Sequence, residues 1–188
     1  AIEDCAHFDQ RPKLEEYGDH VFIVSHGLTC DDVTIGELVL EEVHAFLGQS
    51  YLVTVHMGPV PALDAAWKRL VDDAPVGRRG ADFVYYLVAD RIVDTNFPLL
   101  DRIADELEAI ETAVLAGPEP GQLGDMFRLK RLLVAMRKAL SPQRDVFAML
   151  ARRAGGPVTE RTSLYFRDIY DHLVRLNESI ETNRDLLG

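Results

Sequence analysis

Acidic side chains four residues apart are the first groups in this sequence with a chemistry of their own. Asp90 and Asp94 lie four positions apart in a segment with helical periodicity, so their carboxylates share one helix face. Like charges at this spacing repel by on the order of a few tenths of a kcal/mol, and a hard cation with oxygen ligands would reverse that repulsion. Spacing alone favours the simpler interpretation of two solvated carboxylates beside Arg91.

A second couple combines a carboxylate with an imidazole. Asp168 and His172 are also four apart and could bind one ion from a single helix face. The simpler alternative is a row of surface salt bridges, with Asp171 and Arg175 as the clearest pair. Spacing again favours this alternative. A third acidic group, Glu3-Asp4, lies close to the first residue of the sequence.

Motifs of the common enzyme classes are missing. The sequence has no HExxH, no GxSxG, no GxxxxGK[ST] and no GxGxxG after a strand-like run. The histidines are scattered, and His20, His26 and His56 at strand ends are most simply ordinary surface or core side chains. We therefore predict that the protein is not an enzyme. A metal-dependent hydrolase would need a water-bearing cleft, which nothing in the sequence demands.

Composition narrows the classes of partner. The chain has 188 residues, of which 20 are basic and 31 acidic, giving a formal charge of −11. This surplus repels phosphate backbones and predicts no nucleic-acid binding, whereas it is compatible with cation binding.

No apolar run approaches the ~20 residues that span a bilayer. Cys5 and Cys30 fit a reduced cytoplasmic setting better than a single disulfide. Because the sequence starts without Met or a signal peptide, we expect an internal fragment or a trimmed product.

Periodicity divides the chain into two parts and predicts an α+β fold. Residues 1–80 read as a small, mostly antiparallel sheet with a flanking helix. Short β-rich runs at 21–24, 38–40 and 51–55 are separated by glycine and aspartate. A helix is predicted over 62–73. Its apolar side would consist of Leu63, Trp67, Leu70 and Val71.

Residues 81–188 read as long helices. The first is interrupted by Pro98, which should kink it or mark a turn, and it ends at residues 117–121. A second helix is kinked or restarted at Ser141-Pro142. A third begins near Thr159, a plausible N-cap, and runs on without a stop signal. Its apolar stripe, which can pack against other helices, is Ile169, Leu173, Leu176, Ile180, Asn183 and Leu187.

Several segments together resemble one family. The run YFRDIYDH at residues 165–172, followed by IETNRD at 180–185, resembles the stalk-helix segment of CorA-type magnesium/cobalt transporters, which usually have Val where Ile169 stands. Further matches are IED at 2–4, QRPK at 10–13, HVFIV at 20–24, DRIVD at 90–94 and LKR at 129–131. They occur in the family's order over nearly the whole chain.

This resemblance implies the cytoplasmic part of a pentameric inner-membrane channel, in which an α/β head is followed by long helices. The family's two membrane segments and its Gly-Met-Asn signature would follow Gly188. The resemblance also implies regulatory Mg²⁺ sites between subunits. Asp168 of one subunit would face Asp4 of the next, and Glu3, Asp90 and His172 would form a second site nearby. Thr95-Asn96 stands where the family often has an acidic and an aromatic residue, so this chain has fewer carboxylates near the second site.

Two other readings stay open at this point. One is a zinc or other transition-metal transporter of the same superfamily, because His172 leaves room for Co²⁺, Ni²⁺ or Zn²⁺ beside the oxygen ligands that suit Mg²⁺. The other is a structural helical scaffold whose acidic faces are only solvated. Saturable binding of a divalent cation would separate the scaffold from both transporters.

Overall fold

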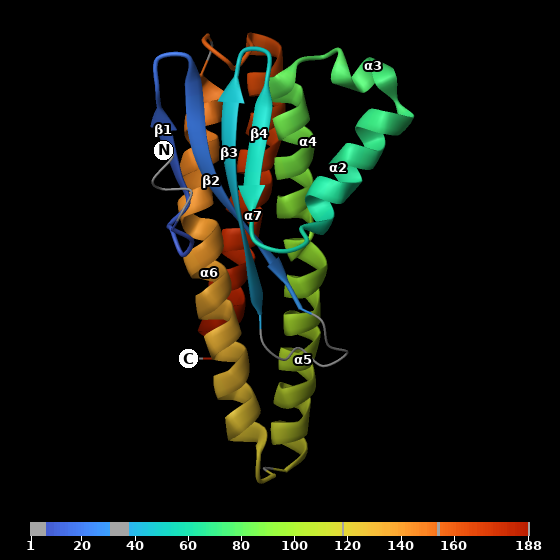
Figure 1. Ribbon diagram of the computed structural model, residues 1–188. Helices are drawn as coiled ribbons and strands as arrows, with labels where there is room; N and C mark the ends of the chain where they lie inside the picture. Colours follow the sequence, from blue (N-terminus) through green and yellow to red (C-terminus); the bar gives the residue numbers. More distant parts are fainter. Residues whose placement is uncertain (1–6, 31–37, 118, 154, 188) are drawn as a thin grey trace.

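A computed structural model of the chain describes residues 7–30, 38–117, 119–153 and 155–187 and has an α+β fold, as predicted (Figure 1). The strands are β1 (Lys13–Glu16), β2 (His20–Thr29), β3 (Val39–Gly48) and β4 (Leu52–His56). The helices are α2 (Pro61–Asp72), α3 (Ala74–Gly77), α4 (Ala81–Asp94), α5 (Asn96–Ala116), α6 (Gln122–Arg152) and α7 (Glu160–Leu186).

The four strands form an antiparallel sheet in the order β1-β2-β3-β4, which confirms the predicted meander. Strand β1 was not predicted, and β2 and β3 are longer than the predicted runs. The reason is that the apolar runs of these strands are interrupted by His26 on β2 and by Glu42 and His44 on β3. Those polar residues are nevertheless buried and continue the strands.

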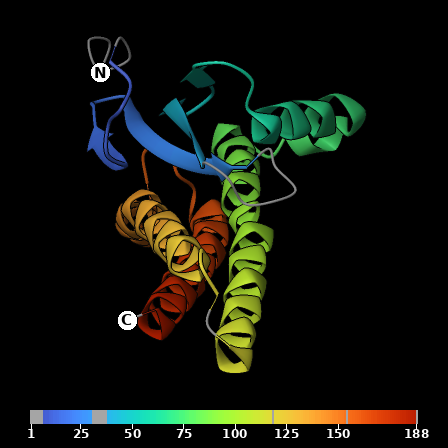
Figure 2. The ribbon, with the colours of Figure 1, turned by 90° about the horizontal axis from the view of Figure 1, so that it is seen from below.

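Long helices cover one face of the sheet. Figure 2, seen from below, shows the sheet lying across one side of α4–α5, α6 and α7.

Thr95 separates α4 from α5 and leaves Pro98 in the first turn of α5, where its missing N–H costs little. Helix α6 continues through Pro142 without restarting. At the start of α7, the Thr159 hydroxyl accepts a hydrogen bond from the backbone N–H of Thr162, as the predicted N-cap requires.

The core lies between the sheet and the long helices. Four members of the predicted α7 stripe are fully buried: Ile169, Leu173, Leu176 and Ile180. The same apolar cluster contains Val21 of β2 and Phe147 of α6, so it joins residues on both sides of the predicted boundary between 80 and 81. The division into a head and a long-helix region therefore stays a prediction.

Helix α2 differs from its predicted orientation. Trp67 and Val71 are largely exposed, and the helix buries the small residues Ala62 and Ala66 instead. Leu63 and Leu70, which were also predicted on the apolar side, are partly buried against the same apolar cluster as these alanines. None of the helices within the described part of the chain is both long and apolar enough to cross a membrane.

Candidate metal centre

Two carboxylates and one imidazole meet where α4 and α7 pack together. Asp90 and Asp94 of α4 and His172 of α7 each place one ligand atom within 4.8 Å of the others. Their positions follow from the burial pattern. Asp90 and Asp94 each follow a buried residue, Ala89 and Val93, and His172 precedes the buried Leu173. All three side chains therefore lie at the edge of the packed seam, half-buried.

The imidazole is held close to one carboxylate but is not hydrogen-bonded to it. His172 Nδ1 lies 3.2 Å from Asp94 Oδ1, outside hydrogen-bond geometry, and no described residue gives this buried nitrogen a hydrogen-bond partner. Phe97 supports the ring edge-on, with 5.6 Å between the ring centroids. A buried nitrogen without a partner beside two carboxylates is an arrangement that a cation could complete.

The site carries excess negative charge. Burial raises the pKa of Asp90, and the nearby carboxylates of Asp94 and Asp168 raise it further, while His172 and Arg69 oppose the shift. The pKa of Tyr86 is raised by burial and then by Asp90, Asp168 and Asp94. Three carboxylates therefore act on the same small region, opposed at Asp90 by His172 and Arg69.

The predicted site residues fall into three groups. Asp90 and His172 come together, as the family resemblance implies. Asp168 lies one helical turn before His172, is exposed, and is outside the three-residue cluster although it acts on Asp90 electrostatically. Glu3 and Asp4 lie outside the described residues.

Asp94 completes the cluster without having been predicted as a site residue. Its spacing from Asp90 was the available signal, and the contact with His172 across two helices could not be read from spacing. His172 was paired with Asp168 on its own helix, whereas the structure groups it with Asp90 and Asp94.

The donor set suits a divalent cation. Mg²⁺ is commonly held by one or two carboxylates and keeps several waters, which a half-buried site allows. An imidazole nitrogen adds affinity for Co²⁺, Ni²⁺ and Zn²⁺. The cluster therefore has the donors for a cation, which would screen the charge between the two helices.

An antiparallel sheet packed on long helices, with a group at their seam that could hold a cation, defines an α+β protein with a candidate cation site. The chain belongs to the CorA-like Mg²⁺ transporter protein family, whose model matches residues 1–188. This is a family of transporters and not of enzymes, as predicted.

Individual relatives agree with this assignment. The Bacillus subtilis protein YfjQ is 33% identical over 186 residues, covering 99% of this chain and 57% of YfjQ. The cobalt/magnesium transport protein CorA of Thermotoga maritima is 33% identical over 188 residues, covering 100% of this chain and 53% of that protein. The chain thus spans about half the length of these relatives. The solved soluble domain of CorA from Methanocaldococcus jannaschii shares the fold, with a TM-score of 0.86 at 23% identity, covering 100% of this chain and 75% of that one.

Proposed function

We propose that this chain is the regulatory part of a divalent cation (Mg²⁺/Co²⁺) transport channel and that it senses the cation through carboxylates at its helix surfaces. The observation that carries the proposal is the cluster of Asp90, Asp94 and His172, in which two carboxylates lie close together beside a buried His172 Nδ1 that has no hydrogen-bond partner among the described residues. Family membership supplies the transport function to which such a sensor would be coupled.

The sensing mechanism depends on electrostatic repulsion between subunits. In a homo-oligomer, which we propose to be a pentamer, Asp168 of one subunit would face Asp4 of the next, and Glu3 would join Asp90 and His172. Exposure of Asp168 supports this role, because its carboxylate is free to meet another subunit. A bound cation would screen the repulsion and hold the closed assembly, and its loss would shift the population towards an open pore.

The rest of the channel would lie in sequence beyond this chain. Its relatives are about twice as long, and T. maritima CorA carries the name of a cobalt/magnesium transport protein. We propose that this chain lies on the cytoplasmic side of the cell membrane and is joined to membrane segments in the whole transporter.

Transition-metal selectivity is the second candidate function. The imidazole of His172 favours it, because nitrogen donors bind Co²⁺, Ni²⁺ and Zn²⁺ better than they bind Mg²⁺. A His172→Gln variant separates the two cases. The substitution should weaken Co²⁺ binding strongly, because it removes the nitrogen ligand. It should weaken Mg²⁺ binding little if Mg²⁺ is bound mainly by the carboxylate oxygens.

Calorimetric titration with Mg²⁺ and Co²⁺ tests the proposed site. The wild-type chain should bind saturably, and Asp90→Asn should reduce affinity by about tenfold or more, because it removes one charged ligand worth about 1.4 kcal/mol. Asp101→Asn is the matched control, since Asp101 is an exposed aspartate on α5 outside the cluster. Equal affinities for the wild type and Asp90→Asn would show that the cluster is not the sensor, and no saturable binding would favour a purely structural scaffold.

A further inference from the structure

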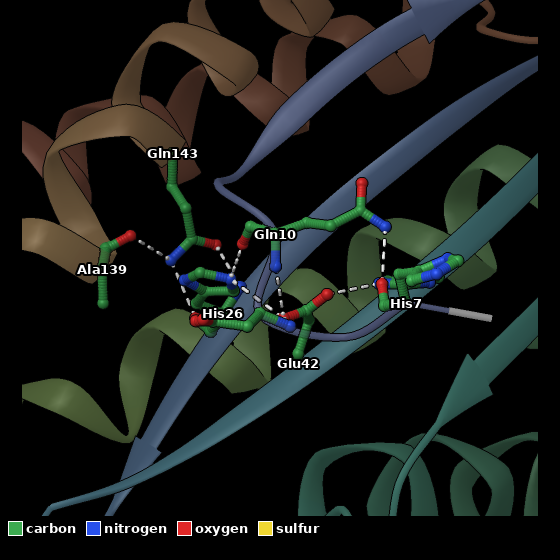
Figure 3. Close-up of polar contacts among 8 residues, drawn as sticks. His7, Gln10, His26, Glu42, Ala139 and Gln143 are labelled. Carbon is green, nitrogen blue, oxygen red and sulfur yellow. Dashed lines mark hydrogen bonds and ion pairs between the residues drawn. The ribbon is translucent and has the colours of Figure 1, made fainter. Parts of the chain in front are cut away.

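A second carboxylate–imidazole group lies on the face of the sheet that the long helices do not cover. It consists of Glu42, His26 and His44, which we name the outer-face cluster, and Figure 3 shows Glu42 and His26 beside Gln10. Glu42 and His26 side chains are 6% and 7% exposed, and His44 is fully buried. A charged side chain buried to this degree needs a complete set of partners.

Both oxygens of Glu42 are occupied by donors from this chain. Oε1 lies 2.5 Å from His44 Nε2. Oε2 accepts the backbone N–H groups of Asp9 at 2.8 Å and Gln10 at 3.0 Å. Asp9 has a φ of 82°, a left-handed conformation that an aspartate adopts only at some cost. The carboxylate therefore holds residues 9 and 10 in a bent path across the sheet.

The two histidines complete this attachment. His26 Nε2 lies 2.7 Å from the backbone carbonyl oxygen of Gln10, and the His44 ring stacks on Phe8 with centroids 4.8 Å apart. Gln143 of α6 fixes the His26 backbone from the other side, donating to its carbonyl and accepting from its N–H. Residues 7–10 are thus attached to β2 and β3 through one carboxylate and two rings.

These contacts define which nitrogen of each ring carries a proton. A carbonyl and a carboxylate can only accept, so Nε2 carries the proton in both histidines. Nδ1 of each is buried without a hydrogen-bond partner among the described residues. A second proton would place an N–H at Nδ1 with nothing to accept it, which is more costly than an unpaired acceptor. Burial accordingly lowers the pKa of His26, although Gln10, Glu42 and Asp9 oppose the shift.

Other charged groups near the cluster do not reverse this conclusion. The cavity beside His26 is lined by the cations Arg11, Arg137 and Lys138 and by the anion Asp9. Lys13 of β1 lies over Phe22, whose ring meets His44 edge-on. Glu42, which contacts the His44 ring, and Asp9 both favour a charged imidazole at His26, but burial outweighs them and keeps the pKa of His26 lowered.

We propose that the outer-face cluster is a proton-controlled clamp, which holds residues 7–10 against the sheet while both histidines are neutral and releases them when a histidine gains a proton. The released form would place the new charge in water, and the segment would leave β2 and β3 while the rest of the sheet stays paired. Because residues 7–10 begin three positions after Asp4, the clamp also fixes the described residues nearest to Glu3 and Asp4 in sequence.

Amide hydrogen exchange of Asp9 and Gln10, measured by NMR, tests the clamp directly. Their protection, corrected for intrinsic exchange, should fall by about tenfold or more between about pH 7.5 and pH 5, because one added proton can change an opening equilibrium tenfold per pH unit. The amides of Ile23 and Ala45, which are paired residues of β2 and β3, should keep their protection. A flat profile for Asp9 and Gln10, or a loss shared with Ile23 and Ala45, would overturn the proposal.

Variants assign the effect to the two rings. His26→Gln with His44→Gln keeps a side-chain donor at each position but removes both titrating groups, so the loss of protection should disappear. His56→Gln is the matched control on β4 and should retain the wild-type profile, since His56 is exposed. A loss that persists in the double variant would contradict the clamp. If the double variant does not fold, wild-type ring nitrogen shifts decide: neutral Nε2-protonated rings at pH 7.5 that charge as protection falls support the clamp, and rings charged at pH 7.5 refute it.

Discussion

The two carboxylate–imidazole groups of this protein combine the same kinds of side-chain group and differ in what already occupies the carboxylate oxygens. In the outer-face cluster, Glu42 accepts two backbone N–H groups and contacts the Nε2 of His44. In the α4–α7 cluster, Asp90 and Asp94 face each other beside a His172 nitrogen that has no hydrogen-bond partner among the described residues. Donors from the protein itself occupy the Glu42 oxygens, whereas the carboxylates of Asp90 and Asp94 could still bind a cation.

This difference shows that carboxylate and histidine together are not sufficient evidence of a metal site. Buried donors turn such a group into an internal structural attachment, because they satisfy the charge without an ion. Half-buried carboxylates on neighbouring helix turns repel instead, so their free energy is lowered by an ion from solution. The two clusters should therefore respond oppositely to mutation and to added cation.

Removal of the Glu42 carboxylate should have the largest effect. Glu42→Ala leaves the N–H groups of Asp9 and Gln10 and the ring of His44 without their acceptor, so it should lower the free energy of unfolding by about 2–4 kcal/mol. Denaturant unfolding at neutral pH, followed by circular dichroism, measures this loss. Glu42→Gln keeps an acceptor oxygen and should lose clearly less. If both variants matched the wild type, Glu42 would not anchor residues 9 and 10.

Added cation should have the next largest effect, and it should act only through the α4–α7 surface. Saturating Mg²⁺ at about 100 times its dissociation constant should raise the free energy of unfolding by about 2.7 kcal/mol, and a chelator should reverse this gain. Asp168→Asn should reduce the gain and the Mg²⁺-dependent protection from proteolysis. Asp171→Asn, an exposed aspartate on the same helix, is the control. A full gain in Asp168→Asn would remove that residue from the site.

Much of the fold was predictable because its signals are local. The α7 stripe, the Thr159 cap and the break before α6 each depend on residues within a few positions, and the structure confirms them. The lengths of β2 and β3 were not predictable from local pattern. The burial of His26 and His44 depends on contacts with Gln10 and Phe8, which lie far from these strand residues in sequence. The exposure of Trp67 was missed because the side of α2 that is buried depends on its packing against α4, which buries Ala62 and Ala66 most deeply.

The candidate site was predictable only in part for the same reason. Spacing identified Asp90 with Asp94 and Asp168 with His172 as pairs on single helices. The cluster joins both members of the first pair to His172 of the second across two helices, and this depends on how α4 packs against α7. The family resemblance named Asp90 and His172 together, since it carries information about tertiary contacts that spacing lacks.

The smallest expected effect concerns the same site without cation. The pKa of Asp90 is raised in the folded protein, so the fold binds this proton more tightly than the unfolded chain does. Its ionised carboxylate therefore destabilises the fold above that raised pKa, and the penalty disappears as pH falls towards the usual range of an aspartate. In a chelator at neutral pH, Asp90→Asn should accordingly be more stable than the wild type by about a few tenths of a kcal/mol.

Saturating Mg²⁺ should reverse that order, because the wild type gains cation binding that Asp90→Asn has lost. Thermal unfolding of both proteins, in chelator and in Mg²⁺, measures the crossing, and the difference in chelator should shrink at acid pH, where Asp90 is protonated in both states. An Asp90→Asn protein that is less stable than the wild type under every condition would mean that Asp90 acts as a structural residue. In that case the contrast between a filled and an open cluster would not hold.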